Sequence, residues 1–368
     1  MRLTRREILR LVALGAVSTA LDSAGAEEQK PNLRQLGADK RLAIGSAFST
    51  NELNPDDESL FRHELSRITP ENELKMTAIR PTRETFDFAR ADAIADFARR
   101  GGLEMRGHAL IWNNDRQPSW LATLSEAEMR SAIEEHIERT IGRYGGRIAV
   151  WDVINEPVGT VAFGPYMLRD GPFVQRLGPD YIAFAFRAAR AVAPVAKLVL
   201  NETHTERDDR FGRDYRRHLL YIIDRLQDTG VPLDGIGLQG HLQPDKPFDP
   251  DEFGAFLDEI ARRKLFIEIT ELDVNDASFP DDIAARDQAV AATYRRFLRT
   301  ALANPAVRSL SFWQLGDGAS WYFAQSVDES PSGQRRPRPL LYDADMRPKL
   351  AFDAVADELR RMPERPRA

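Results

Sequence analysis

The 368-residue chain contains no cysteine, which excludes disulfide bonds and thiolate metal ligands and removes cysteine usage as a marker of redox compartment. It also has no glycine-rich phosphate loop after a strand-like segment, so a nucleotide cofactor is not expected. The net charge is −6, and no basic cluster lies beside interleaved aromatic residues. Nucleic acid is therefore not expected as a partner, and the chain is expected to need no cofactor.

Histidine is scarce as well, with six residues in the chain. Three lie in helix-like stretches and are expected to be surface or packing residues: His63, His136 and His218. The other three follow strand-like segments and are the candidates for metal-assisted hydrolysis: His108, His204 and His241. None of the six stands in an H-x-H or H-E-x-x-H arrangement, so we expect no metal site.

The N-terminus carries the pattern of an export signal. The pair Arg5-Arg6 precedes an apolar run over residues 11–21, and the small residues Ala24-Gly25-Ala26 follow it. This pattern predicts a twin-arginine signal peptide over residues 1–26, with a frayed N-terminal helix as the alternative. The run is too short for a stable membrane span, so we expect a periplasmic or secreted protein with no membrane insertion after cleavage.

Short β-branched segments alternate with amphipathic stretches through the rest of the chain. The strand-like segments are 42–48, 67–72, 103–108, 150–156, 197–202, 235–241, 265–271 and 307–313. Helix-like periodicity lies between them, as at 86–100, 126–144, 181–192 and 287–302. This alternation predicts an α/β fold with a single (β/α)8 TIM barrel over residues 41–360. It also predicts a lead-in over 27–40 and a flexible tail over 361–368.

Polar or aromatic residues end seven of the eight predicted strands. They are Glu71-Asn72, His108, Asn155-Glu156, Asn201-Glu202, Gln239 with His241, Glu271 with Asp273, and Trp313. In a TIM barrel the active site lies at the C-terminal ends of the strands, so this concentration predicts a site there. A doubly wound sheet is the alternative on spacing alone, but it would place its ligand at one switch point rather than at nearly every strand end.

Two of these residues, Glu156 and Glu271, are carboxylates that end strongly apolar strands. Glycoside hydrolysis uses such a pair, one protonated to donate to the leaving oxygen and one ionised to attack or to activate water. Tryptophan faces that suit stacking on sugar rings occur nearby in the sequence, at Trp112, Trp313 and Trp321. The strand tip "INEP" raises a geometric question, because Asn155 and Glu156 should point apart on a regular strand. For both to serve one ligand the strand must bulge or turn there.

These motifs, in this order, resemble the retaining endo-β-1,4-xylanases of glycoside hydrolase family 10. "WDVINE" resembles the family's acid/base motif, which implies Glu156 as proton donor and Asn155 as the amide that binds the sugar 2-hydroxyl. "ITELDV" resembles its nucleophile motif, which implies Glu271 as the attacking carboxylate, with His241 bridging Glu271 and Asp273. The remaining motifs imply substrate contacts from Glu71, Asn72, Lys75, His108, Trp112, Gln239, His241, Trp313 and Trp321. The implied substrate is xylan or a xylo-oligosaccharide, bound by a monomer.

Some positions depart from the family pattern. Met76 stands where an aromatic residue is usual, Asn113 where a histidine is usual, and Gln314 where a glycine is common. The fifth strand ends in "NETHTE" rather than Asn-Asp-Tyr-Asn. We expect these changes to line the glycone side and the rim of the cleft and to affect tolerance of decorated xylan. The alternative functions are a β-1,4-glucanase or mannanase with the same carboxylates, or a barrel that binds polysaccharide without cleaving it.

Overall fold

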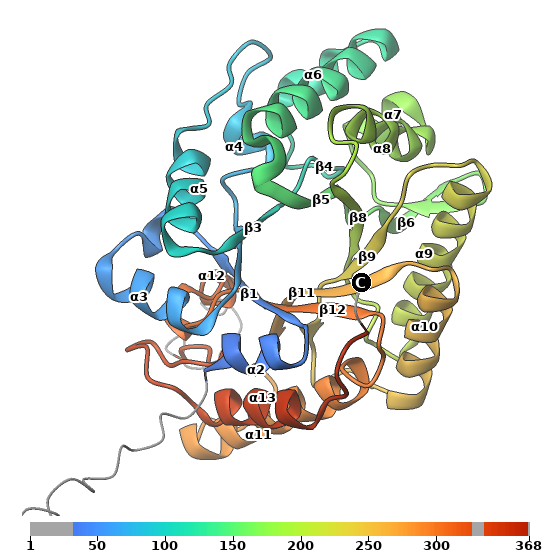
Figure 1. Cartoon of the computed structure of the whole chain (residues 1–368). Coiled ribbons are helices and arrows are strands. Elements are labelled where there is room, and N and C mark those ends of the chain that lie inside the picture. Colours follow the sequence, from blue (N-terminus) through green and yellow to red (C-terminus); the bar gives the residue numbers. More distant parts are fainter. Residues whose placement is uncertain (1–31, 326–334, 367–368) are drawn as a thin grey trace, which may run out of the picture. The chain divides into compact units, whose positions relative to one another are not determined.

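Eight parallel strands close into a barrel in the computed structural model, which describes residues 32–325 and 335–366 (Figure 1). The strands are β1 (Ala43–Phe48), β2 (Arg67–Pro70), β3 (Glu104–Gly107), β5 (Ile148–Asn155), β8 (Lys197–Glu202), β9 (Gly235–Leu238), β11 (Phe266–Val274) and β12 (Val307–Phe312). They pair in this order, and β12 pairs back onto β1. The predicted (β/α)8 barrel is confirmed, with all eight strands at their predicted places.

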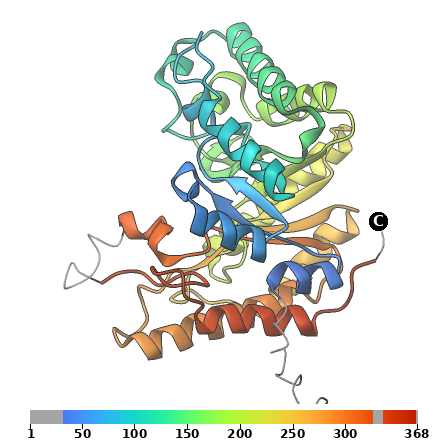
Figure 2. The same cartoon turned by 60° about the vertical axis from the view of Figure 1, so that its left-hand side comes forward.

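A main helix follows each strand and covers the outside of the barrel. These helices are α3 (Pro55–Glu64), α5 (Ala89–Gly101), α6 (Glu126–Tyr144), α8 (Asp180–Val192), α9 (Arg210–Asp228), α10 (Pro250–Arg262), α11 (Ile283–Ala301) and α13 (Leu350–Arg361). Capping chemistry sets their ends: Ser125 and Glu128 form a capping box at the start of α6, and Gly102 ends α5 with φ of 60°. Two views show α11 and α13 running side by side (Figure 2).

Shorter elements decorate the barrel. They are α2 (Leu33–Asp39), α4 (Met76–Ile79), α7 (Pro172–Leu177), α12 (Tyr322–Gln325), β4 (Ile111–Trp112), β6 (Val158–Phe163), β7 (Tyr166–Leu168), β10 (His241–Leu242), and the 3₁₀ turns Thr50–Glu52, Ser119–Thr123, Gly145–Arg147 and Asp317–Ala319. The antiparallel β6–β7 hairpin was not predicted from the sequence. It returns the chain to the tip of β5, where Arg169 donates its backbone N–H to Pro157 O at 2.9 Å.

The barrel interior contains charged side chains beneath the strand tips. Arg106 on β3, 1% exposed, donates to Asp152 on β5 and contacts Glu268 on β11. Arg67 on β2 donates to Glu268 at 2.8 Å. Asp152 also contacts His108 Nδ1 at 2.9 Å, which fixes the imidazole at the barrel mouth. Each of these buried charges contacts a charge of opposite sign. The pairing offsets the cost of burying the charges, which an unpaired charge would add in full.

The N-terminal ends of the strands are covered by both ends of the described chain. Helix α2 packs against β1 and α13. Arg365, 1% exposed, donates to the carbonyls of Leu302 and Val307 at 2.8 Å each, and Arg41 donates to Arg365 O. The structure therefore differs from the flexible tail predicted for 361–368, because residues up to 366 are held on the barrel by these backbone contacts. The predicted signal peptide at 1–26 lies outside the described residues.

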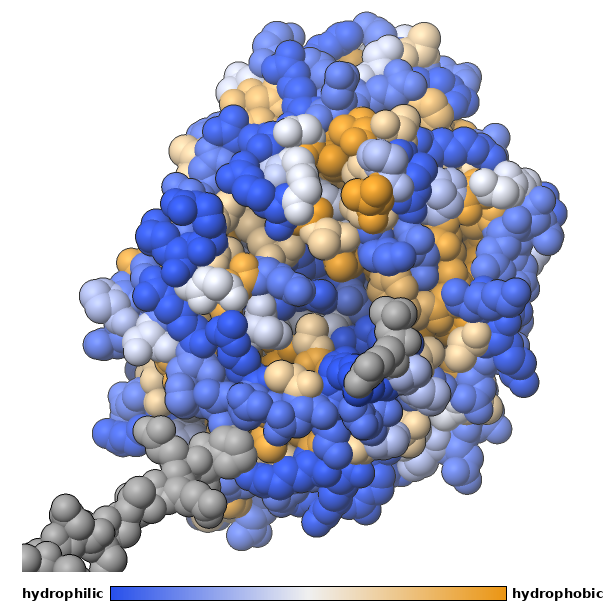
Figure 3. Space-filling model, in the orientation of Figure 1, coloured by the Kyte–Doolittle hydropathy of each residue, from blue (hydrophilic) through white to orange (hydrophobic). Residues whose placement is uncertain are grey.

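The face of the molecule that points forward in Figure 1 is mostly polar, with apolar side chains scattered between (Figure 3). Among residues 32–325 and 335–366, no helix combines the length and the apolar character needed to cross a membrane.

Candidate active site

The nucleophile candidate Glu271 lies in β11 with its side chain almost fully buried in the barrel mouth. Asn201 Nδ2, at the tip of β8, donates to Glu271 Oε1 at 2.7 Å, and His241 Nε2 lies 3.2 Å from Oε2. Burial alone raises the pKa of this carboxyl, but the His241 hydrogen bond and the charges of His108 and Lys75 outweigh it. The pKa of Glu271 therefore lies below its usual value, and the ionised form needed for attack is favoured.

The acid/base candidate Glu156 follows β5 in a left-handed backbone conformation with φ of 50°. Its backbone N–H donates to Asn201 O at 2.7 Å, and the pairing of β5 with β8 carries a register shift between Asp152 and Ile154. Of the bulge or turn expected at this tip, the turn is confirmed by the left-handed Glu156. A left-handed residue reverses the usual alternation, which is how Asn155 and Glu156 come to share one side of the site.

Three donors surround the Glu156 carboxylate. Gln239 Nε2 donates to Oε1 at 2.8 Å, while Trp112 Nε1 and Arg169 Nη2 reach Oε2 at 3.1 and 2.7 Å. Arg169 Nε also donates to the Glu156 backbone carbonyl at 3.1 Å. All three groups that contact the carboxylate oxygens are hydrogen-bond donors. An ionised carboxylate, which only accepts hydrogen bonds, suits these surroundings, and it is the form that acts as a base.

A chain of amides joins the two carboxylates. Asn201 Nδ2 donates to Asn155 Oδ1 at 2.9 Å as well as to Glu271, and Gln239 Nε2 lies 3.5 Å from Asn155 Oδ1 as well as near Glu156. Glu156 and Glu271 are thus the two ends of one hydrogen-bonded chain of side chains at the tips of β5, β8, β9 and β11. Both carboxylates therefore belong to the same barrel mouth.

His241 bridges Glu271 and Asp273, as the sequence predicted, with Nδ1 at 2.9 Å from Asp273 Oδ1. Trp321 Nε1 and Tyr322 Oη donate to Asp273 at 2.8 and 3.1 Å. Burial opposes a charge on the imidazole, but Asp273 and Glu271 together outweigh burial and raise the pKa of His241 well above its usual value. A charged His241 lies between two carboxylates and holds Glu271 in its ionised form.

This raised pKa predicts a pH-dependent contribution of His241 to stability. A histidine whose folded pKa exceeds the unfolded value of about 6.5 stabilises the fold fully below that value and less as pH rises through the folded pKa. Replacing His241 by Gln should therefore cost about 2 kcal/mol of unfolding free energy at pH 6 and markedly less at pH 9. Denaturant titration at both pH values measures this. The matched control is His63→Gln, whose side chain is 57% exposed. Equal costs at both pH values for His241→Gln would contradict the account.

The predicted sugar-binding residues of the glycone side gather around Lys75. Its ammonium lies 5.1 Å from the Trp112 ring and 5.6 Å from the Trp313 ring, and it donates to Asn72 Oδ1 at 3.1 Å. Trp313 lies edge-on to His108 and His241, with ring centroids 5.4 and 6.3 Å away. Glu71 follows β2 and accepts a hydrogen bond from Gln314. The structure thus brings the predicted polar and aromatic residues to one end of the barrel.

Two of the departures do not lie where they were predicted. Met76 is 3% exposed and belongs to the hydrophobic core, because it faces inward at the start of α4. Asn113 is fully buried: its Nδ2 donates to Arg169 O and its Oδ1 accepts the backbone N–H groups of Phe173 and Val174. Asn113 therefore caps the start of α7 and does not line the rim.

The "NETHTE" segment contains two buried acids that sequence analysis did not assign. Glu202 accepts the backbone N–H groups of Val158 and Thr203, and burial raises its pKa to about 8. Burial also raises the pKa of Glu206 to about 7. His204 is partly exposed, has φ of 60°, and lies edge-on to Phe211. Glu202 thus ties this segment to the residue after Pro157, whereas neither carboxylate oxygen of Glu206 has a hydrogen-bond partner among the described residues.

Asn201 and Arg169 are the main site residues that the assignment from sequence missed. Asn201 had a visible signal, because it ends an apolar strand just as Asn155 does. Arg169 had none, because its position depends on the β6–β7 hairpin. Among the described residues, His, Asp and Glu side chains nowhere gather in a group of three that would hold a metal ion.

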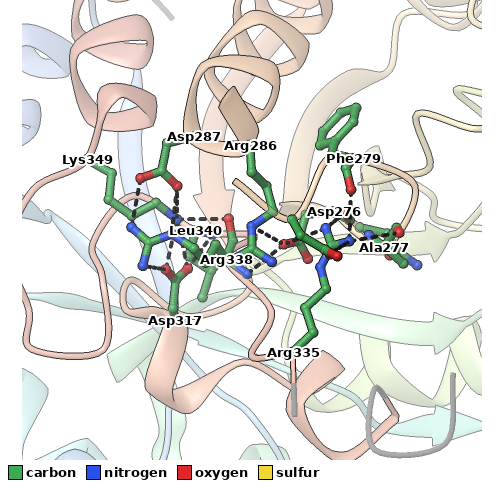
Figure 4. Close-up of polar contacts among 12 residues, drawn as sticks. Asp276, Ala277, Phe279, Arg286, Asp287, Asp317, Arg335, Arg338, Leu340 and Lys349 are labelled. Atoms are coloured by element: carbon green, nitrogen blue, oxygen red, sulfur yellow. Dashed lines mark hydrogen bonds and ion pairs between the residues drawn. The ribbon is translucent and has the colours of Figure 1, made fainter. Parts of the chain in front are cut away.

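A network of ion pairs supports the segment after β12 (Figure 4). Lys349, 7% exposed, donates to Asp317 at 2.8 Å and to Arg338 O at 2.8 Å. Arg338 donates to Asp287 on α11, and its backbone N–H donates to Asp276 at 3.0 Å. The network fastens residues 335–349 to β11 and α11, next to the loop that carries Trp321.

The barrel and the carboxylate pair define a glycoside-hydrolase type of enzyme. The profile of glycosyl hydrolase family 10 matches residues 32–358, and the chain belongs to this family. It is a glycoside hydrolase.

Curated relatives and solved structures agree with this assignment. The chain is 30% identical over 333 residues to a β-1,4-xylanase of Dictyoglomus thermophilum, with 88% of this chain and 89% of the relative covered. It is 30% identical over 360 residues to endo-1,4-β-xylanase B of Thermotoga neapolitana, with 95% and 96% covered. Among solved structures, xylanase 10B of Thermotoga petrophila in complex with xylobiose superposes with a TM-score of 0.79 at 28% identity, covering 90% of this chain and 98% of that one.

Proposed function

We propose that this protein is a retaining endo-1,4-β-xylanase, with Glu271 as nucleophile and Glu156 as acid/base. The observation that carries the proposal is the hydrogen-bonded chain of Asn155, Asn201 and Gln239 that holds both carboxylates at one barrel mouth. The xylanase names of the relatives support xylan as the polymer.

In the first step, Glu271 attacks the anomeric carbon while Glu156 delivers a proton to the leaving oxygen, which gives a glycosyl ester on Glu271. When the proton of Glu156 sits on Oε2, the donors that reach this oxygen must give way, while Gln239 can still donate to Oε1. Arg169 and Trp112 share Oε2 and are the contacts that this proton displaces.

In the second step, ionised Glu156 takes a proton from water, which attacks the same carbon and releases Glu271. Two displacements at one carbon retain its configuration. A retaining mechanism requires the two carboxyls to stand about 5–5.5 Å apart, with no water between them. Asn155 is the amide placed to bind the 2-hydroxyl of the sugar at the cleavage point.

The proposal includes the location and the state of the protein. The Arg5-Arg6 pattern supports twin-arginine export to the periplasm or beyond, and we propose that the mature enzyme works as a monomer on xylan or xylo-oligosaccharides without a cofactor.

A product profile tests the proposed substrate. The protein is incubated separately with xylan, glucuronic-acid-substituted xylan, β-1,4-glucan and β-1,4-mannan. The released oligosaccharides are separated, and their masses are measured by mass spectrometry. Internal cleavage of both xylans with release of pentose oligomers is expected. Cleavage of glucan or mannan in preference to xylan would favour the alternative activities, and binding of xylan without cleavage would favour a non-catalytic barrel.

A further inference from the structure

Gln314, directly after Trp313 at the tip of β12, combines two features that are each unfavourable for stability. Its φ is 85°, a left-handed value that a glycine adopts without strain and a glutamine does not. Its side chain is buried at 1% exposure, yet the amide oxygen Oε1 has no hydrogen-bond partner among the described residues. Strained residues with unsatisfied polar atoms persist where the position is needed for something other than stability.

Among the described residues the Gln314 side chain makes one hydrogen bond, and this bond indicates what the position is needed for. Gln314 Nε2 donates to Glu71 Oε2 at 2.7 Å. A carboxylate acceptor shortens and strengthens such a bond. Glu71 follows β2 and Gln314 follows β12, and both strands pair with β1, so the bond crosses above the tip of β1.

Gln314 makes the largest hydrogen-bond contribution to the Glu71 carboxylate, and the Lys75 charge and the Asn72 side chain act on it as well. Burial raises the pKa of Glu71, while Gln314 and Lys75 oppose that effect. Its backbone N–H is fixed to Phe48 O at 3.1 Å, but that contact does not orient the side chain. Each carboxylate oxygen has two lone pairs, so a Glu71 held by Gln314 can still accept a hydrogen bond from a sugar hydroxyl.

We propose that Gln314 is a positioning residue that orients Glu71 toward the substrate on the glycone side, and that the left-handed backbone is retained for this purpose. The inference rests on the proposed function, since it takes Glu71 as a sugar-binding group. In this role the Gln314 side chain improves substrate binding and lowers the stability of the fold.

Steady-state kinetics on 4-nitrophenyl β-xylobioside, together with thermal unfolding, test this. Gln314→Gly is expected to raise KM about ten-fold with kcat within about two-fold, because binding lost equally in ground and transition states appears in KM. Its Tm is expected to rise by about 2–4 °C as the strain is relieved. Gln314→Ala, which keeps the strain, should raise KM equally without the gain in Tm.

A double-mutant cycle with Glu71→Gln separates positioning from a general structural role. In the Glu71→Gln background, Gln314→Gly should change KM by less than about two-fold, since no carboxylate remains to be oriented. The control is Lys264→Gly, at an exposed residue with φ of 61°, which should raise Tm and leave KM unchanged.

Two results would overturn the inference: an unchanged KM in Gln314→Gly while the wild type cleaves xylan, or the same rise in KM with and without Glu71. A wild type that leaves xylan uncleaved would overturn the proposed function together with the inference, and is a separate, visible outcome.

Discussion

Replacing Glu271 by alanine is expected to lower kcat on xylan by about 10⁵-fold, the scale on which loss of a catalytic nucleophile acts. Asn201 and His241 each hold one oxygen of this carboxylate, so the proposed nucleophile is fixed and ionised before substrate arrives. Without it, no glycosyl ester forms. Sodium azide or formate, small enough for the vacated space, should restore part of the turnover by attacking the same carbon, and the product should then have inverted configuration.

The matched control is Glu138→Ala, which removes an exposed carboxylate from α6 and should leave kcat unchanged. Circular dichroism should show both variants folded. A Glu271→Ala enzyme with more than about one hundredth of wild-type turnover would contradict the assignment of the nucleophile.

Replacing Glu156 by alanine is expected to lower kcat/KM on xylan by about 10³-fold, within the range that general acid catalysis contributes. The size of the loss should depend on the leaving group. A 2,4-dinitrophenyl xylobioside releases a weakly basic phenolate that needs no proton, so the first step should proceed at close to the wild-type rate. The second step lacks its base, and the glycosyl enzyme should accumulate as a burst followed by slow turnover.

Rapid-mixing measurement of dinitrophenolate release separates the two steps. An equal loss on xylan and on the activated substrate would show that Glu156 acts in some way other than proton transfer. Trp112→Phe is a useful companion variant, because it removes one donor to Glu156 Oε2 and keeps the acid itself.

Strand positions were predictable because buried parallel strands are short, β-branched and apolar, and because helices separate them at regular spacing. The predicted segment 150–156 became β5 with its turn at Glu156, and the predicted bridge through His241 is present. The turn at Glu156 followed from alternation along a strand, which is a local property, whereas the His241 bridge was implied by the family resemblance. Properties that depend only on neighbouring residues can be predicted from the sequence directly.

The parts that were missed depend on contacts between distant segments. Arg169 reaches Glu156 only because the β6–β7 hairpin folds back, and nothing in the residues around 169 indicates a partner at 156. Asn113 and Met76 were expected on the glycone side and at the rim of the cleft, because they depart from the family pattern beside residues that the family uses to bind sugar. Adjacent residues can point to opposite sides, and both point into the protein, where Asn113 caps α7.

Covalent trapping identifies the carboxylate that attacks the sugar. The wild-type enzyme is incubated with 2,4-dinitrophenyl 2-deoxy-2-fluoro-β-xylobioside, whose fluorine slows the second step more than the first, and the digested protein is examined by tandem mass spectrometry. The account predicts one fluoroxylobiosyl group per chain, attached to Glu271 in the peptide that contains "EITELDV". Labelling of a different carboxylate, or xylan hydrolysis with no trapped intermediate and an inverted product, would contradict it.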